Sequence, residues 1–136
     1  MNRILGLDVG DKRIGIALSD EMRLIASPHS VYTRVGWGPD CRHLASLFQQ
    51  NGCSLVVCGL PKNMDGSVGF QAEKVMAFAE KLKEEGLPVE FQDERLSTVS
   101  AHDALIEGGM RRDNRKGTVD KVAAAVILQQ YLDKQR

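Results

Sequence analysis

Four acidic residues stand where strands and helices of this sequence are expected to begin or end. Asp8 interrupts the apolar run 4–9, Asp93 and Glu94 follow a later apolar stretch, and Asp120 lies in the first turn of the last expected helix. Burying an unpaired carboxylate costs on the order of several kcal/mol, and neighbouring carboxylates raise one another's pKa. A divalent cation relieves both costs, because magnesium prefers oxygen ligands.

The positions of these acids suggest phosphodiester chemistry. Ligands of open α/β sheets gather beyond the carboxyl ends of the strands, and the first and last strands could be parallel neighbours that bring Asp8 and Asp93-Glu94 to one rim. Two cations about 4 Å apart at such a rim activate a water and stabilise the leaving oxygen. Each acid alone also has a structural explanation: an arginine partner for Asp8, a solvated strand end for Asp93, or a helix dipole for Asp120. The hypothesis therefore depends on their combination.

Basic side chains flank the same rim. Those expected to contact a nucleic-acid backbone are Lys12, Arg13, Lys62, Arg95, Arg111, Arg112, Arg115 and Lys116. The last four belong to the polar stretch 109–117, which is expected to form a loop before Asp120. A solvated loop is the usual explanation of such a run, but beside a metal site it would meet a nucleic-acid backbone. The loop 59–67, "GLPKNMDGS", either places a helix N-terminus against phosphate or simply connects two elements.

The elements that must position these residues alternate after an initial run of strands. The expected strands cover residues 3–9, 12–19, 29–34, 54–60 and 88–92. The expected helices cover residues 41–51 with Asp40 as cap, 69–85, 97–107, and a last helix capped by Thr118. A hairpin followed by alternating strands and helices predicts a mixed sheet covered by helices.

Composition narrows the class of protein. The 136 residues suit one domain, and the 18 basic and 18 acidic side chains cancel, so any case for nucleic acid depends on local clustering. No apolar run approaches the ~20 residues that span a bilayer, and a strand is expected almost at once, which leaves no room for a secretory signal. Cys41, Cys53 and Cys58 are expected to be reduced core residues. We therefore expect a cytoplasmic protein without membrane contact.

Four blocks of sequence together resemble the YqgF family, also called RuvX. They are "LGLDVGDKRIGIALSD", "VVCGLPKNMDGS", "DERLSTVSA" and "KGTVDKVAAAVIL", in the order found in the family. The resemblance implies one ribonuclease H-like domain over residues 1–136, related to the RuvC resolvases. It implies a five-stranded mixed sheet of order 3-2-1-4-5, with the first three strands antiparallel and helices at its sides.

The resemblance also implies an activity. The family is associated with 5′ maturation of pre-16S ribosomal RNA and with cleavage of branched DNA, such as Holliday junctions. Its acids fall on Asp8, Glu94 and Asp120, which implies that these three are catalytic and hold Mg²⁺ or Mn²⁺. The implied partner is structured RNA, as pre-16S RNA or a precursor ribosomal subunit, or branched DNA. Two positions depart from the family pattern: Asp11, where many members have Thr, and Lys121, where Ser is frequent.

Two other functions fit parts of the sequence. The stretch "LDVGDKRIGIAL" also resembles the phosphate loop of the actin and sugar-kinase superfamily, although those enzymes need two such domains. A non-catalytic module that binds structured RNA or proteins is the other alternative. Binding of ATP without binding of nucleic acid would favour the first, and binding without hydrolysis in any divalent metal would favour the second.

Overall fold

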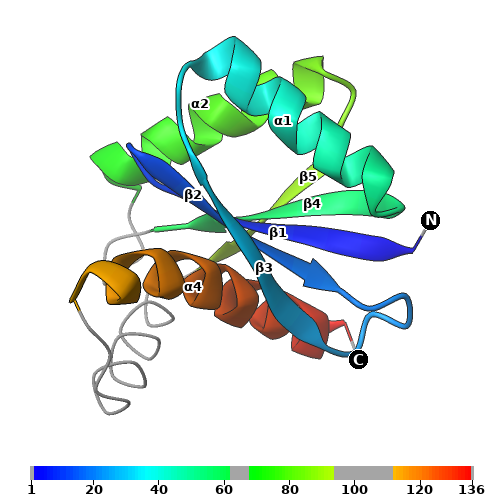
Figure 1. Cartoon of the computed structure of the whole chain (residues 1–136). Coiled ribbons are helices and arrows are strands. Elements are labelled where there is room, and N and C mark those ends of the chain that lie inside the picture. The colour runs from blue at the N-terminus through cyan, green and yellow to red at the C-terminus, as the bar shows by residue number, and fades with distance from the viewer. Residues whose placement is uncertain (1, 62–67, 94–111, 136) are drawn as a thin grey trace.

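A computed structural model describes residues 2–61, 68–93 and 112–135 of the chain, without the side chains of residues 112–119. The elements of this structure are, in chain order (Figure 1), β1 Arg3–Val9, β2 Arg13–Ser19, β3 Ala26–Thr33, α1 Trp37–Gln50, β4 Cys53–Leu60, α2 Phe70–Glu84, β5 Val89–Asp93 and α4 Arg112–Lys134. The expected helix 97–107 lies outside the described residues.

The five strands form one mixed sheet of order β3-β2-β1-β4-β5, which confirms the predicted order. β2 pairs antiparallel with β1 and with β3, while β4 is parallel to both β1 and β5. The possibility that the first and last strands are direct neighbours is not borne out, because β4 lies between them. β1, β4 and β5 nevertheless run in the same direction, so their carboxyl ends meet at one edge of the sheet.

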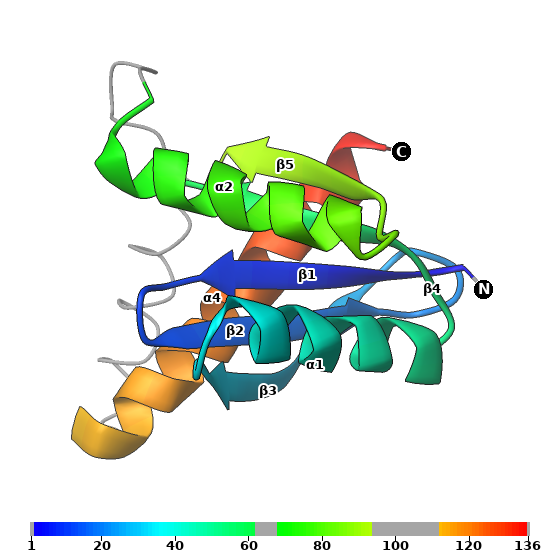
Figure 2. The same ribbon diagram turned by 90° about the horizontal axis from the view of Figure 1, so that it is seen from above.

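Helices cover both faces of the sheet. α1 and α2 lie on one face and α4 lies on the other (Figures 1 and 2). Side chains alternate between the faces along a strand. In β1, Leu5 and Leu7 therefore pack in the core beneath α1 and α2, whereas Ile4 packs in the core beneath α4. The same alternation directs Asp8 toward α4.

Two helix starts differ from the sequence-based expectation. α1 begins at Trp37, so Asp40 lies inside its first turn, and its Oδ1 accepts hydrogen bonds from the backbone amides of Val35 and Gly36 at 3.0 and 3.3 Å. α4 begins at Arg112, so residues 112–117 are helical instead of forming a loop, and Thr118 is not its cap. In the described residues, no helix is both long and apolar enough to cross a membrane.

Candidate active site at the carboxyl end of β1

Asp8 is a half-buried acid near the end of β1. Its register partner on β2 is Gly15, and the residues on either side of it, Leu7 and Val9, are buried on the opposite face of the sheet. Within the described part of the chain, no residue donates a hydrogen bond to its carboxylate. Burial, and secondly the negative charge of Asp120, raise the pKa of Asp8 to about 6. Among the described residues, Asp8 therefore lacks the hydrogen-bonding partner that a purely structural role would require.

Asp120 reaches the same place from the distant end of the chain. α4 crosses β2 so closely at Gly15 that a side chain there would overlap the backbone carbonyl of Asp120. The Arg13 guanidinium donates a hydrogen bond through Nε to Oδ2 of Asp120 at 2.7 Å. Because Gly15 has no side chain at this crossing, the two acids Asp8 and Asp120 can lie close together. Among the described residues, Arg13 is the one cation that contacts either acid.

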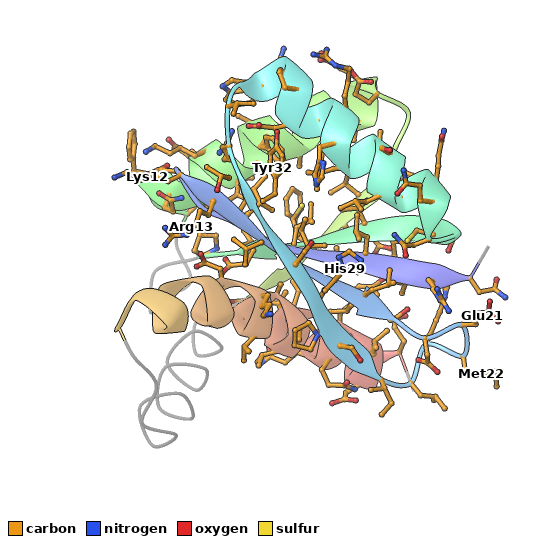
Figure 3. All side chains as sticks on the ribbon, viewed as in Figure 1. Lys12, Arg13, Glu21, Met22, His29 and Tyr32 are labelled. Atoms are coloured by element: carbon orange, nitrogen blue, oxygen red, sulfur yellow. The ribbon has the colours of Figure 1, made fainter. Side chains whose placement is uncertain are left out.

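The other predicted residues divide into three groups. Lys12, which is exposed, and Arg13 lie at this end of the sheet, opposite to the turn that carries Glu21 and Met22 (Figure 3). Asp93 ends β5 opposite Leu60 and is partly buried at the same edge. The remaining predicted residues either lie outside the described residues or, in α4, have no described side chain: Lys62, Glu94, Arg95, Arg111, Arg112, Arg115 and Lys116.

The residues present fit a divalent cation. Asp8 and Asp120 offer carboxylate oxygens, the ligand type that Mg²⁺ and Mn²⁺ prefer. A bound cation would offset both causes of the raised pKa of Asp8, namely its burial and its repulsion from Asp120. Over the described ranges, no group of three or more His, Cys, Asp or Glu side chains is arranged to hold a metal ion. The third predicted ligand, Glu94, follows β5 directly but lies outside those ranges.

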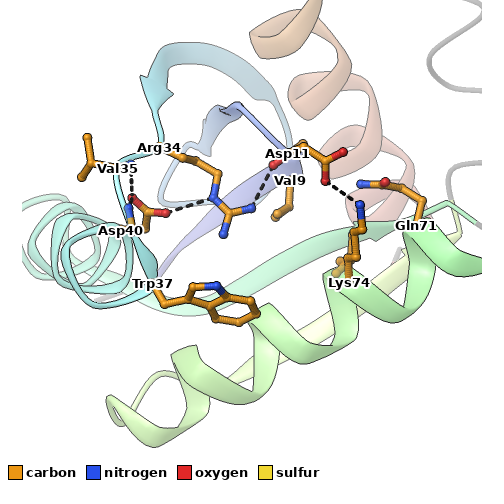
Figure 4. A pocket seen from close by; sticks show the side chains of 11 residues that line it. Val9, Asp11, Arg34, Val35, Trp37, Asp40, Gln71 and Lys74 are labelled. Carbon is orange, nitrogen blue, oxygen red and sulfur yellow. Dashed lines mark hydrogen bonds and ion pairs between the residues drawn. The ribbon is translucent and has the colours of Figure 1, made fainter.

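Sequence reasoning missed a second polar cluster at the same sheet edge. Arg34 donates through Nε to Oδ2 of Asp40 at 2.9 Å and through Nη1 to the carbonyl of Gly10 at 3.0 Å (Figure 4). Asp40 is fully buried, and it lines a pocket of about 460 Å³ on the face covered by α1 and α2. The available signal in the sequence is Arg34 at the end of an expected strand, followed three residues later by Trp37.

Comparison with known proteins now identifies the family. The RuvX profile, described as "Holliday junction resolvase", matches residues 2–134 of the 136. The chain belongs to the RuvX family. Two relatives named "Putative pre-16S rRNA nuclease" are similar: one from Desulforamulus reducens is 50% identical, covering 96% of both chains, and one from Clostridioides difficile is 49% identical, covering 96% of this chain and 94% of its own.

Solved structures share the RuvX chain's fold at low sequence identity. T. thermophilus RuvC in complex with a Holliday junction substrate has a TM-score of 0.61 at 15% identity, covering 99% of this chain and 96% of its own. The fowlpox virus resolvase complexed with Holliday junction DNA has a TM-score of 0.56 at 13% identity and covers 98% of both chains. The predicted family and ribonuclease H-like fold are thereby confirmed.

Proposed function

We propose that this RuvX-family chain is a divalent-metal-dependent endonuclease that hydrolyses phosphodiester bonds in structured nucleic acid, namely the 5′ end of pre-16S ribosomal RNA. The observation that carries the proposal is the placement of Asp8 beside Asp120 at the carboxyl end of β1. The names of the relatives support RNA as the substrate, and those of the fold neighbours support branched DNA as the alternative. The place of action would be the cytoplasm.

In this proposal, acidic residues would bind the metal ions and basic residues would bind the phosphate backbone. Asp8 and Asp120, joined by Glu94, would hold Mg²⁺ or Mn²⁺. The bound cations would supply an activated water and neutralise charge on the scissile phosphate. Arg13 already contacts Asp120 and is partly exposed, so it can turn toward a phosphate oxygen when a cation replaces it. Lys12, exposed in the adjacent turn, would hold the backbone on the same side.

Incubation with defined substrates tests the proposal. The substrates are a pre-16S leader RNA, a four-way DNA junction and a linear duplex, each with Mn²⁺ and with EDTA. We expect cleavage of the leader RNA with Mn²⁺ only, and its loss in Asp8→Asn. Asp133→Asn is the matched control, because it changes an exposed acid at the far end of α4. Cleavage of the junction alone would support the alternative substrate, and undiminished cleavage by Asp8→Asn would refute the assignment.

A further inference from the structure

A pocket on the second face of the sheet lies at the same edge as the candidate active site. We call it the Trp37 pocket. Its lining includes Asp11, Arg34, Trp37, Asp40, Gln71 and Lys74 (Figure 4). The turn after β1 separates the two sites, because Asp8 faces α4 while its neighbour Val9 lines the pocket. The volume of about 460 Å³ falls within the range of roughly 300–1,000 Å³ of small-ligand sites.

Arg34 is held in a fixed orientation at the back of this pocket. Two of its nitrogens are bound, by Asp40 and by the carbonyl of Gly10, and its guanidinium carbon lies 4.9 Å from the ring centroid of Phe78. No described residue accepts a hydrogen bond from the remaining nitrogen, Nη2. A buried ion pair adds little net stability compared with apolar packing of the same volume. The Arg34–Asp40 pair is therefore better explained by its effect on the orientation of Arg34 than by stability.

The front of the pocket offers contacts of a different kind. Trp37 is 46% exposed, which leaves part of its ring accessible for stacking. Lys74 places a partly exposed ammonium group at the mouth, and Gln71 supplies both an amide donor and an acceptor. Aromatic stacking, paired donor and acceptor groups, and two cations together match a base linked to a phosphate.

We propose that the Trp37 pocket binds one nucleotide, with its base against Trp37 and its phosphate between Lys74 and the free edge of Arg34. The inference extends the proposed function, since a nucleotide of the substrate strand is one source of this ligand; a free mononucleotide is the other. Asp11 opposes the phosphate through its ion pair with Lys74 at 3.2 Å, but both side chains are substantially exposed, so the pair is weak and displaceable.

Trp37 allows a direct measurement, because it is the only tryptophan of the chain. Its fluorescence is followed during titration with a short single-stranded RNA and, separately, with a mononucleotide, both in EDTA so that no cleavage occurs. Anisotropy of a labelled strand measures overall binding in parallel. We expect saturable quenching; tighter binding of the strand would identify it as the source, and tighter binding of the mononucleotide would identify the free ligand.

Substitutions of pocket residues, compared with a lysine outside the pocket, show whether binding depends on contacts in the pocket or on the overall charge of the protein. We expect Lys74→Ala to weaken binding about three- to tenfold, as loss of one phosphate contact does. Gln71→Ala should also weaken binding, while Asp11→Thr should strengthen it. The matched control is Lys81→Ala, which removes an exposed, ion-paired lysine from the other end of α2.

Two results would overturn the pocket proposal. One is unchanged Trp37 fluorescence and unaltered affinity of the Lys74 and Gln71 variants for both ligands. The other is quenching without any effect of these variants, since that would place the ligand outside the pocket. If metal-dependent cleavage remains intact, either result refutes only the proposal that the pocket binds a nucleotide, and the nuclease proposal stands. Binding in the pocket without cleavage in any metal would refute the nuclease proposal alone.

Discussion

Gly15 lies directly against the backbone of Asp120, so closely that any side chain at Gly15 would overlap the Asp120 carbonyl. Gly15 is also the register partner of Asp8. One glycine on β2 therefore sets how near two acids from opposite ends of the chain can lie. The contact involves backbone atoms of α4, which cannot rotate away as a flexible side chain would.

Gly15→Ala is expected to displace the first part of α4 from the sheet. Overpacking of this kind costs about 1–3 kcal/mol of unfolding free energy, and cleavage should fall further because Asp120 moves away from Asp8. Urea unfolding and cleavage rates measure the two effects. Gly38→Ala is the control, because the nearest atoms to a Cβ there belong to the flexible end of the Arg42 side chain. Full activity of Gly15→Ala would show that the close crossing is not needed.

Asp8→Asn is expected to abolish cleavage and to stabilise the fold in a pH-dependent way. The pKa of Asp8 is raised to about 6 from 3.8 by burial and by Asp120, so the folded state binds the proton more tightly than the unfolded state. The wild type therefore loses stability as pH rises from about 4 to about 6, by an amount of about 2–3 kcal/mol. The variant's advantage in chemical denaturation should grow over that range; a constant difference would contradict this account.

Divalent metal is expected to raise the melting temperature of the wild type. Ligands that bind only the folded state stabilise it by mass action, and saturating Mn²⁺ should add about 5 °C or more at pH 7.5. The gain should shrink at pH 5, where Asp8 is largely protonated, and should disappear with EDTA or in Asp120→Asn. An equal gain in wild type and Asp120→Asn would place the metal elsewhere.

Arg13→Ala is expected to separate metal binding from substrate binding. Arg13 forms an ion pair with Asp120 and so competes with a metal ion for its carboxylate. Its removal should therefore leave Mn²⁺ affinity unchanged or raise it by up to about fivefold. RNA affinity and cleavage should fall, because a phosphate contact is lost. Calorimetry with Mn²⁺ and RNA anisotropy measure the two, with Arg42→Ala on α1 as control. Weaker Mn²⁺ binding would mean that Arg13 supports the metal site.

Asp40→Asn is expected to destabilise the fold by about 3 kcal/mol, because Arg34 would lose the charge that balances it. Burial raises the pKa of Asp40, but hydrogen bonds from the Val35 amide and the Arg34 guanidinium outweigh burial and hold it below 3.8. The stabilisation is therefore present above about pH 4 and is lost as pH falls below it. Denaturation of wild type and variant should differ at pH 7 and converge below pH 4.

Sequence patterns predicted the sheet well because strand periodicity is a local property. The alternation of buried residues in β1 and β2 is visible in the sequence, and it confirms the predicted hairpin. The sequence predicts that α4 begins after Thr118 as its cap, whereas it begins at Arg112, because the polar stretch before Thr118 carries no apolar face to mark a helix. The predicted cap of α1 is also wrong. Asp40 lies inside the first turn of the helix, where its carboxylate accepts hydrogen bonds from the amides of Val35 and Gly36, which precede the helix.

The sequence by itself determined that Asp8 lies in a buried strand, and together with its family blocks it determined the order of the sheet. Only the tertiary structure decided that Asp120 lies near Asp8, and that Arg34, Trp37 and Lys74 line one pocket. The physical reason is that alternation along a strand depends on adjacent residues alone. The approach of α4 to β2, and of α1 to α2, instead depends on how distant segments pack across the two faces of the sheet.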